Sequence, residues 1–250
     1  MEYPRLLSCL DADFTRLRQV AASHDLSAPV PSCPEWTLDD LVRHVAFVYL
    51  HKSTCMREGK FPESWPPDLS GEPTMALLDR TYGELIAEFA ARKPDEPTIT
   101  WYEPEQTVGF WIRRMAQETV IHRVDAELAA GTPFTEIPDD LAIDGVDEVL
   151  ERFLGYGSHA WHEDVEADLP AEELPPVLVG AGERGWLVRS APDGVSVEPA
   201  APGRSAPATL AGSPTPMLLW FWRRTDDGVA RTGDPALIDQ LHRLLGAVTL

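Results

Sequence analysis

Residues 109–133 read GFWIRRMAQETVIHRVDAELAAGTP, and this stretch decides how the first part of the chain folds. Its apolar side chains recur at intervals of three or four residues, the spacing that places them on common faces of an α-helix. The sequence Gly131, Thr132, Pro133 is typical of a helix C-terminus, because glycine tolerates the left-handed conformation and proline cannot continue the helix. The stretch therefore predicts a long helix over about residues 108–130.

Glu118 and His122 stand four residues apart in this predicted helix, so their side chains lie on one face, about 6 Å apart, and can reach the same ion. Carboxylate oxygen and imidazole nitrogen together suit zinc and its neighbours among the metals. Two ligands from one helix do not complete a site, so a third has to come from another element. His44 is the best candidate, because a bundle would turn inward the helix face that it shares with Leu41, Val45 and Val48.

The spacing alone leaves a simpler interpretation open. The composition of the chain makes a single Glu-x3-His pair unremarkable, and a buried histidine often bonds to a glutamate one turn away. Asp125, three residues after His122, also has two interpretations. It either orients His122 from behind the metal or pairs with a neighbouring surface charge.

The helix that carries His44 has a recognisable start. Thr37 can cap it by accepting a bond from the third amide, while Asp40 bonds back to Thr37, and Gly59 ends the helix. The Pro-rich residues 60–73 are expected to form a loop. The remaining helices of a bundle spanning residues 1–160 are predicted over 6–22, 74–92 and 139–159.

The pattern changes after residue 160. Residues 161–175 are acidic and contain proline, and we expect a linker there. Residues 176–250 are predicted to form a small α+β domain, because short β-like runs separated by Gly and Pro precede helical runs. The β-like runs lie at 177–179, 186–188, 195–197 and 209–210, and the helical runs at 216–224 and 235–248. The expected fold class is therefore mainly α.

The chain carries 41 acidic residues against 21 Lys plus Arg, a formal net charge of −20. Such a surface repels phosphate backbones and anionic headgroups, so nucleic acid and membranes are poor partners. Three cysteines without a CxxC motif favour a reducing compartment. The N-terminus does not have the pattern of a signal peptide, and no apolar run has the length of a membrane span. We expect a cytoplasmic protein.

Several stretches together resemble one family. They are VPSCPEWTLDDLVRHV (30–45), the stretch 109–133 quoted above, LAIDGVDEVL (141–150) and MLLWFWRRTDDGVARTGDPALI (217–238). In combination they resemble the mycothiol-dependent maleylpyruvate isomerase-like family of the DinB-like superfamily, of actinobacterial type. The resemblance implies a DinB-like four-helix bundle followed by an α+β domain reminiscent of sterol-carrier proteins.

The same resemblance implies a zinc ion held by a histidine of the second helix and by a Glu-x3-His pair. These map onto His44, Glu118 and His122. The resemblance also implies mycothiol as a thiol cofactor, and a basic residue of the C-terminal domain that helps to hold an anionic substrate. Arg223 and Arg224 are the nearest matches to that residue.

The leading hypothesis is a zinc enzyme that uses mycothiol for isomerisation or S-transfer on a small electrophile, as a monomer or homodimer. Three protein ligands would leave a coordination position open, as in catalytic zinc sites. One alternative is a metal-binding protein of this fold without thiol chemistry, either a hydrolase or a metal-sequestering protein. Another is an acidic regulatory protein with a vestigial site.

Overall fold

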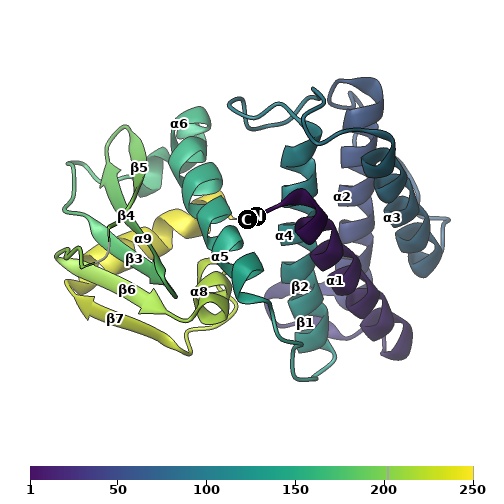
Figure 1. The fold of residues 1–250 in the computed structure, drawn as a ribbon. Coiled ribbons are helices and arrows are strands. Elements are labelled where there is room, and N and C mark those ends of the chain that lie inside the picture. The colour runs from purple at the N-terminus through teal and green to yellow at the C-terminus, as the bar shows by residue number, and fades with distance from the viewer. Residues whose placement is uncertain (202, 250) are drawn as a thin grey trace. The chain divides into compact units, whose positions relative to one another are not determined.

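The computed structural model describes residues 1–201 and 203–249, and the chain divides into two compact units, Met1–Glu136 and Ile137–Leu250 (Figure 1). The division falls before the helical segment that begins at Asp139, whereas the sequence analysis placed that segment in a bundle ending at residue 160. The segment lies in the second unit because its first helix packs against a helix of that unit, Pro214–Phe221. Periodicity identifies an apolar face but not the element that covers it.

The first unit is a bundle of four long helices with a short β-hairpin between the first two. Its main helix pairs are α1 with α4 and α2 with α3, while α2 also contacts α4. The elements are α1 (Tyr3–Ser23), β1 (Pro29–Val30), β2 (Cys33–Thr37), α2 (Leu38–Glu58), α3 (Thr74–Ala91) and α4 (Val108–Ala129).

The N-terminus of α2 has the predicted capping box. The Thr37 hydroxyl accepts a hydrogen bond from the Asp40 amide at 3.2 Å, and the Asp40 carboxylate accepts one from the Thr37 amide at 2.9 Å. The helix ends at Gly59, whose φ of 68° is in the left-handed region. These local bonds fix where α2 starts and therefore which residues face α4.

Helix α4 is buried on nearly all sides, and its charged residues are therefore paired. Arg123 is fully buried and donates hydrogen bonds to Asp13 of α1 and to Glu127, both at 2.9 Å. Glu127 also accepts a bond from Arg16 of α1 at 2.5 Å. This ion-pair network satisfies charges that would otherwise be costly to bury and joins α4 to α1.

The second unit contains a five-stranded sheet in the order β5-β4-β3-β6-β7, in which β3 and β6 are parallel and the other pairs are antiparallel. Each predicted β-like run lies within a strand, whereas the sequence analysis did not predict β7. The strands are β3 (Val177–Ala181), β4 (Arg184–Ala191), β5 (Gly194–Pro199), β6 (Ala208–Gly212) and β7 (Val229–Gly233).

Helices complete this unit: most precede β3, one connects β6 to β7, and one follows β7. The segment expected to be a linker, 161–175, contains two short helices, α7 and η2. The helices are α5 (Asp139–Glu148), the π-helix η1 (Val149–Tyr156), α6 (Gly157–Ala160), α7 (His162–Val165), the 3-10 helix η2 (Glu166–Asp168), α8 (Pro214–Phe221) and α9 (Pro235–Val248). The predicted fold class, a helical bundle followed by a small α+β domain, is confirmed. None of the helices among the described residues combines the length and hydropathy required of a membrane span.

Candidate metal centre

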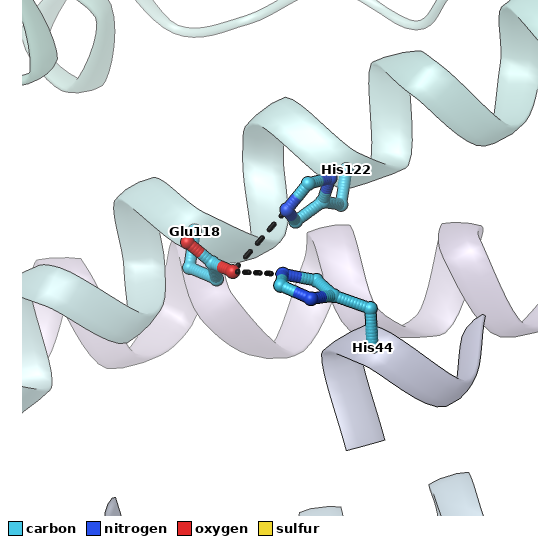
Figure 2. A group of neighbouring side chains, drawn as sticks. All are labelled: His44, Glu118 and His122. Atoms are coloured by element: carbon cyan, nitrogen blue, oxygen red, sulfur yellow. Dashed lines mark hydrogen bonds and ion pairs between the residues drawn. The ribbon is translucent and has the colours of Figure 1, made fainter. Parts of the chain in front are cut away.

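Figure 2 shows His44 of α2 facing Glu118 and His122 of α4. One oxygen of Glu118, Oε1, lies 3.1 Å from Nε2 of His44 and 3.2 Å from Nε2 of His122. One ligand atom from each residue can be chosen so that all lie within 4.8 Å of one another. The structure therefore brings together the three residues that the sequence analysis selected as metal ligands.

The site is closed on the α4 side and open at His44. The side chains of Glu118 and His122 are each 11% exposed, whereas that of His44 is 36% exposed. Trp36, in the hairpin strand β2, borders this opening. Its ring centre lies 4.8 Å from that of His44 and 6.3 Å from that of His122. A ligand that enters at His44 would therefore meet an aromatic wall on one side.

Asp125 is fully buried behind His122. Its Oδ2 atom lies 3.0 Å from Nδ1 of His122, and its Oδ1 atom accepts a hydrogen bond of 2.5 Å from the hydroxyl of Ser32. A carboxylate in this position selects the tautomer that carries hydrogen on Nδ1, so Nε2 stays available to a metal. Of the two interpretations of Asp125, the structure favours a partner that orients His122 over a surface ion pair.

The charges of the site are strongly coupled. Burial opposes ionisation of Glu118, but the positive charge of Arg114 and the contacts with His122 outweigh it and hold the pKa of Glu118 well below its usual range. Arg114, one turn before Glu118, donates a hydrogen bond to its second oxygen. Burial disfavours protonation of His122, yet Glu118 and Asp125 raise the pKa of His122 to about 9. Without a metal, the proton on His122 partly neutralises the negative charge of the buried Glu118 and Asp125 carboxylates.

The donor set fits zinc. Two imidazole nitrogens and one carboxylate oxygen match the ligand type of catalytic zinc sites, which keep a fourth position open. Ligand atoms about 2.0–2.1 Å from a tetrahedral ion would be roughly 3.3 Å from one another. The separations of 3.1 and 3.2 Å between Glu118 and the two histidines are close to that value. Glu118 is therefore already spaced to share an ion with either histidine, and the donor atoms of all three residues lie within 4.8 Å of one another.

Arg223 and Arg224 follow α8 in the second unit. Arg223 has a positive φ of 61°, and its guanidinium donates a hydrogen bond of 2.6 Å to the carbonyl of Thr249. Arg224 donates one of 2.6 Å to the carbonyl of Trp222. The role of either arginine in holding a substrate stays a prediction.

The sequence analysis missed two residues next to the site. Ser32 occupies the turn of the hairpin, and a turn serine has no sequence signal that points to Asp125, 93 residues later. Trp36 was not among the candidate site residues. Its place two residues before α2 was visible in the sequence, but its contact with both histidines depends on how the hairpin folds over α4.

Comparison with known proteins agrees with this architecture. A family model described as the mycothiol maleylpyruvate isomerase N-terminal domain matches residues 7–127, and one described as the MDMPI C-terminal domain matches residues 140–240. The crystal structure of a mycothiol-dependent maleylpyruvate isomerase is similar, with a TM-score of 0.63 and 17% identity over 94% of this chain and 95% of that chain. A histidine-to-alanine mutant of a mycothiol-dependent maleylpyruvate isomerase matches over the same shares, with a TM-score of 0.63 and 16% identity.

No curated protein matches the chain in sequence. At 16–17% identity the structural likeness establishes the fold, whereas the two family models establish the relationship, because together they cover most of both units. The chain belongs to the mycothiol maleylpyruvate isomerase family.

Proposed function

We propose that this chain is an enzyme that binds one zinc ion through His44, Glu118 and His122 and uses it to activate a low-molecular-weight thiol, mycothiol, for reaction with a small electrophilic substrate. The observation that carries the proposal is the convergence of these three donors at the partly open end of a buried site. Membership of a family named for a mycothiol-dependent isomerase supports the choice of thiol.

A zinc ion bound there would lower the pKa of a thiol at its open position and so supply a thiolate near neutral pH. The residues around it have separate tasks. Asp125 holds the His122 ring by its Nδ1 atom, and Arg114 holds one oxygen of Glu118. Trp36 narrows the approach beside His44.

In an isomerisation, the thiol would act as a true cofactor, because the reaction returns it unchanged. When bound, the thiol would supply a nucleophile for reversible addition to a double bond conjugated to a carbonyl, which would accept the electron pair. Rotation about the resulting single bond and loss of the same thiolate would then change the geometry of the double bond. S-transfer would use the same nucleophile but retain the new carbon–sulfur bond and release a leaving group. Both reactions need a thiolate beside an electrophile, and the substrate decides between them.

The experiment is zinc analysis and thiol-dependent turnover on the same preparation. We expect about one zinc per chain, and isomerisation of maleylpyruvate or consumption of another electrophile only when mycothiol is present. His122→Ala serves as the metal-deficient control. Zinc without any affinity for mycothiol would contradict the thiol chemistry and favour a metal-binding protein of another activity. A chain that retains no zinc would contradict the proposal as a whole.

A further inference from the structure

Lys52 lies on α2 two turns beyond His44, and its ammonium group is held by uncharged rings. Its Nζ atom is 4.9 Å from the ring centre of Trp111 on α4 and 3.1 Å from Nδ1 of His51. Burial, together with the charge of Lys52, lowers the pKa of His51 to about 4, so that imidazole is neutral at physiological pH. Neither ring neutralises the ammonium charge, although an aromatic face attracts it.

A second feature of Lys52 is that no carboxylate among the described residues lies beside its ammonium group. In the ranges 1–201 and 203–249, no Asp or Glu lies within ion-pair distance of Lys52, although the chain has 41 acidic residues and a net charge of −20. Arg16, Arg57, Arg80 and Arg123 of the first unit pair with carboxylates. The half-buried Arg43 instead donates hydrogen bonds to the carbonyls of Leu69 and Glu72. Burying a cation without a counter-charge is costly, and the burial of Lys52 lowers its pKa to about 8.

Lys52 faces the same side of α4 as the candidate metal centre. Trp111, Arg114 and Glu118 follow one another at intervals of three and four residues, which places them along one face of α4. Trp111 and Glu118 are seven residues apart, about 10 Å along the helix axis. The charges of Glu118 and Arg114 both act on Lys52. Along the helix axis, the Trp111 ring that the ammonium group contacts is therefore separated from Glu118 by about the length of a small, multi-carbon molecule.

We propose that Lys52 is a specificity-determining residue that binds a carboxylate group of the substrate whose reactive carbons lie at the metal centre. The inference rests on the proposed function and narrows its electrophile to a small carboxylic acid. Trp111 and His51 hold the ammonium group in position, but neither ring carries a negative charge that would neutralise it. A substrate carboxylate bound to Lys52 would supply a counter-charge and orient the rest of the substrate toward His44.

The test uses ligands that span the distance. The metal-loaded protein, with Co²⁺ in place of zinc so that thiolate binding is visible by absorbance, is titrated with 6-mercaptohexanoate and with its neutral match, 6-mercaptohexanol. The variants are Lys52→Met, which removes the charge, Lys52→Arg, which keeps it, and Lys93→Met, which removes an exposed lysine of the first unit. Metal content and thermal unfolding of each variant show that it is folded and loaded.

We expect the wild-type protein and Lys93→Met to bind the acid at least about tenfold more tightly than the alcohol, a difference of about 1.4 kcal/mol. Lys52→Met should bind the two equally, and Lys52→Arg should retain part of the preference. An unchanged preference in Lys52→Met would overturn the assignment. If the wild-type protein binds neither thiol, the proposed function fails, and calorimetry with hexanoate then decides on Lys52 alone: equal affinity of the wild type and Lys52→Met would overturn the assignment.

Discussion

The Oδ2 atom of Asp125 lies 3.0 Å from Nδ1 of His122, on the side of the ring opposite to Glu118. Because this carboxylate is fully buried and also bonded to Ser32, it fixes the ring in one orientation. His122 therefore presents Nε2 to the space shared with His44 and Glu118.

Removal of His122 should abolish metal retention. His122→Ala deletes an imidazole that a rigid helix holds in place, and no other described imidazole or thiol belongs to the cluster apart from His44. We expect less than about one-tenth of the wild-type zinc after dialysis against a weak chelator. Arg223→Ala is a suitable control with unchanged zinc content, because a guanidinium does not bind a cation. Full activity of metal-free His122→Ala would refute the role of the metal.

Loss of the carboxylate behind His122 should weaken metal binding without unfolding the chain. Asp125→Asn keeps the shape of the side chain but removes its charge, and we expect zinc affinity to fall roughly 10–100-fold. Ser32→Ala should have a smaller effect in the same direction, because Ser32 acts on the metal only through Asp125. Competition with a chromophoric chelator measures both affinities. Wild-type affinity in Asp125→Asn would show that the hydrogen bond to His122 does not assist metal binding.

Zinc affinity should rise with pH because zinc displaces a proton from His122. The pKa of His122 in the metal-free protein is about 9, above its ordinary value of 6.5. We therefore expect the zinc affinity to increase by up to about tenfold per pH unit toward pH 9 and then to level off. Asp125→Asn should level off at a lower pH, because it removes one source of the raised pKa. An affinity that is constant between about pH 7 and 9 would contradict a protonated His122.

The raised pKa of His122 also affects the stability of the metal-free protein. Its raised pKa means that His122 contributes stability fully below about pH 6.5 and loses it as the pH rises through about 9. Unfolding by urea at pH 6.5 and at pH 9.5 should therefore show a lower free energy of unfolding at the higher pH. In His122→Ala this part of the pH dependence should be absent.

The buried ion-pair network between α1 and α4 should matter more for stability than ion pairs at the surface. Arg123→Ala leaves Asp13 and Glu127 without their buried partner, and we expect a loss of about 3–5 kcal/mol in the free energy of unfolding. Arg18→Ala breaks a pair with Asp79 in which both side chains are more than 40% exposed, so its cost should be below about 1 kcal/mol. Denaturant titrations of both variants would detect this difference, and equal losses would be evidence against the network.

The two arginines after α8 should influence turnover and not metal binding, if either holds an anionic substrate. Arg223→Ala and Arg224→Ala should keep their zinc, and the variant that removes the substrate contact should raise KM about tenfold or more, because the guanidinium fork binds carboxylates. Steady-state kinetics and zinc analysis on the same samples separate the two effects. Unchanged kinetics in both variants would exclude this role.

The sequence by itself determined the local features of this protein. The periodicity of residues 109–133 predicts α4, and with it the common face of Glu118 and His122, because helix geometry relates residues only four apart. Thr37 and Asp40 likewise determine the start of α2, because a capping box involves neighbouring residues. The sequence also selected His44 as the third ligand, because His44 shares the apolar face of its own helix and because the resemblance to a known family implies a histidine there.

Only the tertiary structure decided which distant side chains meet. Ser32 and Asp125 are 93 residues apart, and their contact depends on the fold of a hairpin against α4. Nothing in the sequence distinguishes Lys52 from a surface lysine, whereas the packing of α2 on α4 places it over Trp111 without a carboxylate partner among the described residues. The helical segment from Asp139 belongs to the second unit for the same reason. Periodicity shows which face of an element is apolar, but only the packing of the whole chain selects its partner.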